Sequence, residues 1–192
     1  MPIRKGYLIA LIFAVVIFGA VKLTNPHRKY STAEFWEQAT VASVQEVPQK
    51  ALQPGNRNGS VLMWAAMGTS DVEIIRELVY RGANVNESDP QFSGTPISAA
   101  AGYGRSPQII TELVRLGGDV NKTVNNDETP LMIAARFNHK PWFVEALVAA
   151  GARVDAENAQ GATALDIAIR NQNTTAEQAL RALKKKESAD RP

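Results

Sequence analysis

The feature of this sequence that most constrains its fold is a seven-residue pattern that recurs four times at a nearly constant interval. The pattern begins at Ser60, Thr95, Thr129 and Thr163. The successive intervals are 35, 34 and 34 residues. A second pattern, a leucine-valine pair followed by a glycine, recurs with the same period and has its leucines at Leu78, Leu113 and Leu147. Two independent markers with one period indicate an internal repeat, and a repeat of this length predicts a stack of small units.

Each marker contains residues that begin or end a helix. Threonine followed by proline, as at Thr95 and Thr129, is typical of a helix start, because the hydroxyl accepts a hydrogen bond from a free backbone N–H and proline has none to lose. An alanine pair then keeps the first helix thin. A second helix is expected to begin near Ser70, Ser106, Pro141 and Thr174. Gly82, Gly117 and Gly151 are expected to end three of these helices in the left-handed conformation.

These residues resemble the ankyrin repeat. The pattern of that family is Thr-Pro-Leu-His-x-Ala-Ala, followed by paired aliphatic residues and Gly-Ala, and the resemblance covers residues 60–186. It is strongest over 94–121 and 128–155. The resemblance implies an all-α solenoid of helix-turn-helix units with projecting loops. The histidine of the family is replaced in each unit, by Met63, Ser98, Met132 and Asp166.

The division into units follows from the repeat and its flanking segments. Residues 31–59 are interpreted as an N-terminal capping helix or degenerate repeat, because Ser31 and Glu34 have the spacing of a capping box and a stack needs a polar unit at each end. The predicted ankyrin repeats are residues 60–93, 94–127 and 128–160. A C-terminal capping repeat is predicted over residues 161–187, followed by a tail over 188–192.

The first thirty residues are basic at both ends and apolar between them. Residues 6–21 carry no charge. If Leu23 is counted and the side chain of Lys22 reaches toward the lipid headgroups, the stretch is long enough to cross a bilayer. Residues 1–23 are therefore predicted to form a signal anchor or transmembrane helix, joined to the repeats by a linker over 24–30. Cleavage as a signal peptide and an unrelated buried segment remain alternatives, although cutting after Ala20 would leave the bulky Phe18 where a small residue is preferred.

The charge of the chain changes at the same boundary. Five of the 21 lysine and arginine residues precede Ser31, which leaves 16 basic against 19 acidic residues in the remainder. This acidic balance argues against a nucleic-acid-binding surface. The absence of cysteine excludes disulfides and thiolate metal sites and suits an oxidising compartment. A short flank ahead of a single anchor usually stays inside, so the C-terminal domain is expected in the periplasm, held at the inner (cytoplasmic) membrane of a bacterium by a single pass.

The resemblance also implies where a partner protein would bind. In an ankyrin stack the first helices line a concave face, and loops between the units project beside it. The first-helix candidates are Met67, Tyr103, Arg136, Phe137, Arg170 and Asn171. The loop-tip candidates are Arg57, Gln91, Phe92, Asn125, Asn126 and Gln160. Aromatic, methionine and arginine side chains are enriched in protein interfaces. The alternative for Phe92 and Phe137 is packing beneath a neighbouring loop, and Trp64 is expected in the core.

The sequence contains no convincing catalytic, cofactor or metal motif, so no enzyme, cofactor, metal or small-molecule substrate is predicted. His27 and His139 are the only histidines and are expected to share no site. Glu73 and Glu77 lie on one helix face, where pairing with Arg76 and Arg81 is more plausible than acid–base chemistry.

The function predicted from these features is that of a non-catalytic protein-binding module tethered to a membrane. In its build the chain resembles two kinds of bacterial ankyrin protein, which have different known uses. One is an accessory protein for an exported enzyme such as a periplasmic catalase, and the other is an immunity protein against a toxin or effector delivered into the periplasm. The alternative function is that of a structural subunit of a membrane complex, acting through its transmembrane anchor.

Overall fold

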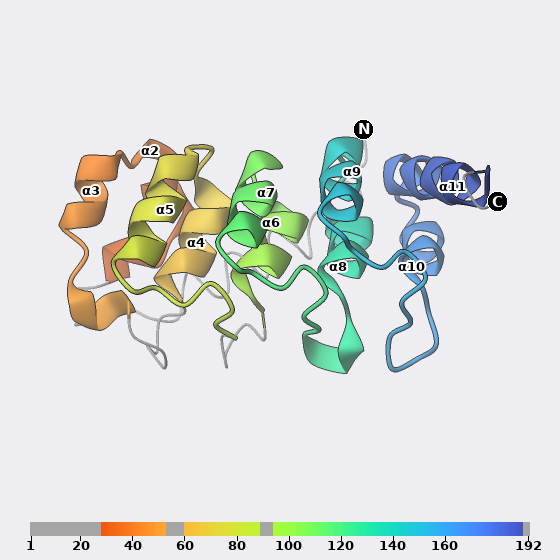
Figure 1. Cartoon of the computed structure of the whole chain (residues 1–192), viewed down its shortest axis with the longest axis horizontal. Coiled ribbons are helices and arrows are strands. Elements are labelled where there is room, and N and C mark those ends of the chain that lie inside the picture. The colour runs from red at the N-terminus through yellow and green to blue at the C-terminus, as the bar shows by residue number, and fades with distance from the viewer. Residues whose placement is uncertain (1–27, 53–59, 89–93, 190–192) are drawn as a thin grey trace, which may run out of the picture.

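A computed structural model describes residues 28–52, 60–88 and 94–189, which form a row of helix pairs (Figure 1). The described residues contain helices and short 3-10 turns and no strand. The predicted anchor over residues 1–23 lies outside the described residues. None of the helices in the described part of the chain combines the length and the apolar character that a membrane crossing requires.

The helices lie in two layers, and each pair contributes one helix to each layer (Figure 1). The inner layer consists of α2 (Ala33–Gln38), α4 (Val61–Gly68), α6 (Pro96–Tyr103), α8 (Pro130–Phe137) and α10 (Ala164–Arg170). The outer layer consists of α3 (Val41–Gln45), α5 (Val72–Tyr80), α7 (Gln108–Arg115), α9 (Pro141–Ala149) and α11 (Thr174–Ala189). The 3-10 turns are η1 (Arg28–Tyr30), η2 (Gln49–Leu52) and η3 (Asn125–Asp127). Within each layer a helix contacts its neighbours in the adjacent units, so the stack is continuous.

The inner helices begin where the repeated pattern predicts. The Thr95 hydroxyl accepts a hydrogen bond from the backbone N–H of Ser98 at 3.1 Å, and the Ser98 hydroxyl accepts one from the backbone N–H of Thr95 at 2.8 Å. Asp166 makes the same reciprocal contact with Thr163, and the hydrogen bonds from the Thr163 hydroxyl and backbone N–H lower the pKa of Asp166. Ser98 and Asp166, which replace the family histidine in their units, thus complete the capping boxes of α6 and α10.

The outer helices α5 and α7 begin differently from the prediction. The cap of α5 is Asp71, not Ser70, because its carboxylate accepts a hydrogen bond from the backbone N–H of Glu73 at 2.9 Å. Pro107 occupies the capping position of α7 and has no side-chain group to offer. Ser106 contributes its backbone carbonyl, which accepts from the first turn of α7, in place of the predicted hydroxyl cap.

The last helix is capped by Asn173 in place of the predicted Thr174. The Asn173 side-chain oxygen accepts from the backbone N–H of Ala176 at 3.2 Å, and its nitrogen donates to the carbonyls of Ala135 at 3.0 Å and Asn138 at 2.9 Å. Asn173 is fully buried. Asn173 therefore caps α11 and at the same time ties it to the preceding unit.

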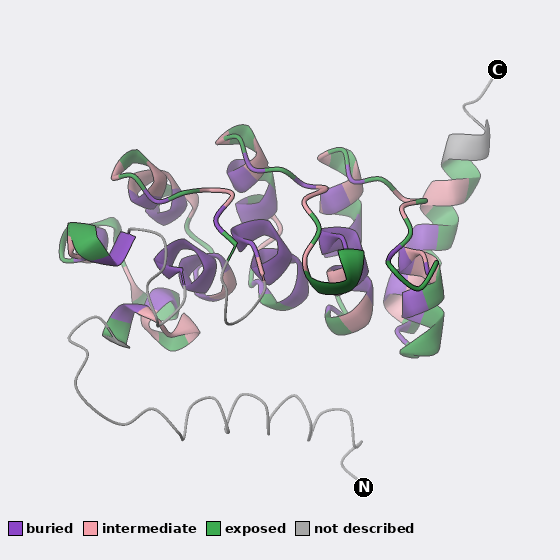
Figure 2. Cartoon of the chain, turned by 90° about the horizontal axis from the view of Figure 1, so that it is seen from below, coloured by how far each residue is buried: buried purple, intermediate pink, exposed green. Residues whose placement is uncertain are grey.

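The hydrophobic core lies between the two layers. Leu78, Leu113 and Leu147 occupy equivalent places in α5, α7 and α9, and all three are fully buried. Burial of a leucine side chain stabilises a fold by about 1.5–3 kcal/mol relative to leaving it exposed. Trp64 is 8% exposed, which confirms its predicted place in the core. Figure 2 shows the buried residues on the sides of the helices that face their neighbours.

Glycine ends the outer helices as predicted. Gly82, Gly117 and Gly151 have φ angles of +98°, +93° and +96°, in the left-handed region where a side chain would be strained. No such glycine follows α11, which continues to Ala189.

The N-terminal pair, α2 and α3, packs on the first repeat in the manner of a further unit. Its inner helix is capped by the Thr32 hydroxyl, one residue after the predicted Ser31. Trp36 is fully buried and donates its ring N–H to the carbonyl of Tyr30 at 2.8 Å. Gly68 allows α2 to approach α4 closely, because a Cβ atom there would lie 2.2 Å from the carbonyl oxygen of Ala33.

Candidate functional site

The first-helix candidates for the concave face lie toward the C-terminal ends of the inner helices, on the surface that we call the inner face. Tyr103 and Phe137 are the last residues of α6 and α8 and are 52% and 41% exposed. Arg170 ends α10 and is exposed, as is Asn171, which caps that helix. Met67 and Arg136 are half-buried, one residue before the ends of α4 and α8.

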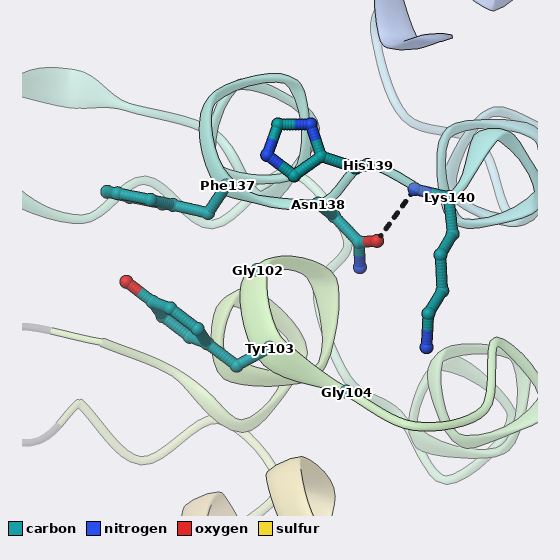
Figure 3. A pocket seen from close by; sticks show the side chains of 7 residues that line it. All are labelled: Gly102, Tyr103, Gly104, Phe137, Asn138, His139 and Lys140. Atoms are coloured by element: carbon teal, nitrogen blue, oxygen red, sulfur yellow. Dashed lines mark hydrogen bonds between the residues drawn. The ribbon is translucent and has the colours of Figure 1, made fainter. Parts of the chain in front are cut away.

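The structure brings Tyr103 and Phe137 together as a stacked pair, which we call the aromatic pair. Their ring centroids are 5.4 Å apart and the ring planes are inclined by 27° (Figure 3). Gly102 makes this approach possible, because a Cβ atom there would lie 2.9 Å from Cγ2 of Ile133 in α8. The sequence identified each ring as a candidate but not the contact between them, since the repeat period does not reveal how closely two units approach.

Arg136 lies against the aromatic pair. The carbon of its guanidinium group is 5.8 Å from the centroid of the Phe137 ring, within the range of a cation–π interaction. The guanidinium also forms an ion pair with Glu128, whose side chain is buried. Burial raises the pKa of Tyr103, and the positive charge of Arg136 opposes that rise. The phenol therefore stays protonated at neutral pH and can donate a hydrogen bond.

A pocket of about 230 Å³ opens beside the aromatic pair (Figure 3). Its lining residues are Gly102, Tyr103, Gly104, Phe137, Asn138, His139 and Lys140. Asn138 fixes the turn between α8 and α9, because its side-chain oxygen accepts from the backbone N–H of Lys140 at 3.1 Å and its nitrogen donates to the carbonyl of Ala101 at 2.9 Å. This turn carries the exposed side chains of His139 and Lys140 to the edge of the pocket.

Asn138 and Lys140 were not among the residues that the sequence singled out for binding. They follow the last helical residue directly, so the same repeat alignment that identified Phe137 could have included them. Some large apolar side chains that the sequence did not single out for binding are also exposed. Tyr80 is 87%, Trp142 49% and Ile169 44% exposed.

The described loop-tip candidates lie in two neighbouring loops that project from the helices (Figure 1). Asn125, Asn126 and Gln160 are exposed, and Asn126 has a φ of +58°. The carbonyl of Asn126 accepts from the backbone N–H of Ala159 at 2.9 Å, so the two loops are joined. The other three candidates, Arg57, Gln91 and Phe92, lie outside the described residues.

The acidic residues considered for chemistry take part in structural contacts. Glu73 forms the expected ion pair with Arg76, but Arg81, which was expected to pair as well, forms no ion pair with a carboxylate of the described residues. Its guanidinium donates to the carbonyls of Val44 and Val47, at 2.7 Å for Val47, because α3 packs against α5. In the described part of the chain, no group of three or more histidine, aspartate or glutamate side chains is placed to hold a metal ion.

A buried carboxylate joins two outer helices. Glu112 of α7 is 6% exposed and accepts hydrogen bonds from Arg115 Nη2 at 2.6 Å and from Arg76 Nε of α5 at 2.7 Å. These hydrogen bonds, the one from Arg115 first, lower the pKa of Glu112 to about 2. A carboxylate that is so firmly ionised and so fully paired holds two units together and is unsuited to proton transfer.

Comparison with known families identifies the repeat. The family model for "Ankyrin repeats (3 copies)" matches residues 62–157 and, in a second alignment, residues 97–190. Together the two matches span about two thirds of the chain and include the aromatic pair. A comparison with curated proteins finds no match.

Proposed function

Because the chain belongs to the ankyrin-repeat family, whose repeats generally act as non-catalytic modules for protein–protein interaction, we propose that its inner face binds a partner protein through the aromatic pair. The observation that carries this proposal is the stacked contact between Tyr103 and Phe137, about half exposed on two adjacent inner helices. Aromatic rings that are exposed to solvent and held in a fixed position are suited to become the buried centre of an interface.

The surroundings of the aromatic pair support this proposal. Each ring ends a helix that packs along its length on its neighbours, so the rings are presented by a rigid layer and little ordering is needed when a partner binds. Arg136 adds a guanidinium beside the rings, and arginine is enriched with tyrosine and tryptophan at interface hot spots. Binding then occludes or organises the partner without a conformational switch in the stack.

The proposed location of the module rests on the sequence alone. We propose that residues 1–23 tether it to the inner membrane and that the repeats face the periplasm, because this stretch is uncharged over residues 6–21 and basic residues flank it. The partner is then an exported protein. Support of a periplasmic enzyme and neutralisation of a periplasmic toxin remain the two uses that fit such a module.

The proposal is tested by partner capture from detergent-solubilised membranes of the native host. The full-length chain serves as bait, and the test variant combines Tyr103→Ala with Phe137→Ala. The matched control combines Tyr80→Ala with Trp142→Ala, which removes two exposed aromatic side chains from the outer layer. A stoichiometric partner that is retained by the control and lost by the test variant is the expected result. Capture that is indifferent to the test variant would refute binding through the aromatic pair.

A further inference from the structure

We infer that the segment of the partner that binds the inner face is acidic, with an aromatic side chain seated at the pocket and a carboxylate reaching Arg170. This inference rests on the proposed function, since it describes what the same face recognises. It is carried by the charges that surround the aromatic pair, by the size of the pocket and by the spacing of the units.

Three cations lie near the aromatic pair or one unit along the stack from it, and they are incompletely paired. Lys140 and Arg170 are exposed, and among residues 28–52, 60–88 and 94–189 no carboxylate forms an ion pair with either of them. Arg136 has a single carboxylate partner among the described residues, Glu128, and a third of its side-chain surface remains exposed. A carboxylate from a partner would therefore find guanidinium and ammonium groups whose hydrogen-bond donors are still available.

The outer layer gives its arginines a different environment. Arg76 and Arg115 both bind the buried carboxylate of Glu112. Arg81 is occupied by two backbone carbonyls. The chain after Tyr30 also carries more acidic than basic residues, so most of its surface disfavours an acidic partner. The ends of α8 and α10 thus present exposed cations on a domain that carries more acidic than basic residues, which favours an acidic segment at this face.

The size of the pocket favours a side chain of a larger partner over a free small molecule. Its volume of about 230 Å³ is below the roughly 300–1,000 Å³ that is typical of small-molecule sites. Gly102 and Gly104 line the pocket, and Gly102 lets α6 and α8 approach closely enough for the two rings to stack at its edge. One aromatic side chain of the partner can pack there against Tyr103 and Phe137.

The repeat spacing sets the distance between the anchor and the carboxylate. Arg170 occupies in α10 the place that Arg136 has in α8, so it lies one unit along the stack. Packed helices are about 8–10 Å apart. An extended chain advances roughly 3.3 Å per residue, so this separation corresponds to about three residues. The partner segment should therefore carry aspartate or glutamate about three positions from its aromatic anchor.

The test is a selection of random peptides displayed on phage against the purified full-length chain in detergent. Selected peptides are then synthesised, and their affinities are measured by fluorescence anisotropy. The expected peptides combine an aromatic residue with an acidic residue about three positions away. The test variant reverses the two available charges, with Lys140→Glu and Arg170→Glu, and should weaken binding at least fivefold. Raising the salt concentration should weaken binding to the unchanged chain as well.

The control variant reverses two exposed charges that no inner helix carries, with Arg153→Glu and Lys186→Glu. It changes the net charge equally and should leave peptide affinity within twofold. Circular dichroism and thermal unfolding establish that both variants are folded. If the test variant does not fold, the single substitution Arg170→Gln, which removes the charge without reversing it, replaces it and should weaken binding at least twofold.

Failure of this inference differs from failure of the proposed function. Selected peptides without an acidic residue, no enrichment of any peptide, or binding that survives charge reversal would overturn the inference. The proposed function would still stand if the Tyr103→Ala and Phe137→Ala variant lost its partner from host membranes. Peptides that bind equally well to both the charge-reversal and the double-alanine variants would refute the inference and the role of the aromatic pair together.

Discussion

The last residue of the inner helix has opposite roles at the N-terminal end of the stack and in its middle. In α4 this residue is Gly68, which is buried beneath α2 so tightly that a Cβ atom would lie 2.2 Å from the carbonyl oxygen of Ala33. In α6 and α8 it is Tyr103 and Phe137, which are about half exposed and stack on each other. The same position of the repeat therefore serves packing at one end and leaves an open aromatic surface in the middle.

The position of a residue within the repeat therefore does not by itself determine whether that residue is buried. The neighbouring unit decides it, because α2 covers the end of α4, whereas no described segment covers the aromatic pair. The usable inner face therefore begins at α6. The covered end is thus expected to hold the stack together, while the open middle is free to bind.

The largest effect on stability is expected from Trp36→Ala at the covered end. Trp36 is fully buried in α2, and its loss removes both its packing and the hydrogen bond to the carbonyl of Tyr30. Large-to-small changes of this kind destabilise by about 3–5 kcal/mol. Hydrogen exchange should show α2 and α4 opening first, because a stack loses stability unit by unit. Uniform exchange throughout the stack would contradict a locally held end.

A smaller effect is expected from Gly68→Ala, which adds a single methyl group at the covered position. Because the nearest atoms are the carbonyl oxygen of Ala33 and Cβ of Trp36, α2 has to shift, at a cost of about 1–3 kcal/mol. Chemical denaturation measures this cost. The matched change Tyr103→Ala at the equivalent position of α6 should change stability by at most about 1 kcal/mol. Equal losses in the two variants would remove the distinction between covered and open positions.

The sequence predicted the helix starts and the inner-face contacts to different extents. The starts of α6 and α8 follow from Thr95 and Thr129, because a hydroxyl followed by proline defines a cap locally. The start of α11 was predicted one residue late, at Thr174, although asparagine is itself a preferred cap; the hydrogen bonds of Asn173 to the preceding unit depend on packing and could not be predicted. The exposure of Tyr103 and Phe137 could be inferred from the repeat alignment, but their contact depends on how closely α6 and α8 pack.

The pairing of Glu112 predicts a pH dependence of stability that arises in the outer layer. The pKa of Glu112 is lowered to about 2 in the folded chain, from an ordinary value of 4.5. The unfolded chain therefore takes up this proton first as the pH falls, so the stability that Glu112 contributes is complete above about pH 4.5 and is lost toward pH 2. Glu112→Gln should reduce stability at pH 7 by about 1–2 kcal/mol and flatten its dependence over this range.

Denaturation curves measured between pH 2 and pH 7 test this prediction, with Glu145→Gln as the control. Glu145 is an exposed residue of the neighbouring outer helix α9 and should leave the curve unchanged. An unaltered pH dependence in Glu112→Gln would show that the clamp between α5 and α7 does not stabilise the stack. Binding of the partner at the inner face should be the same in both variants at pH 7.

The most direct test of the account compares partner binding and thermal unfolding in the double variant with Tyr103→Ala and Phe137→Ala. The account predicts that partner binding is lost while the melting temperature falls by no more than about 2–4 °C, the shift expected for roughly 1 kcal/mol in a chain of this size. Retained binding would contradict the role of the aromatic pair in recognition. A fall in melting temperature as large as that of Trp36→Ala would show that the rings hold the stack together.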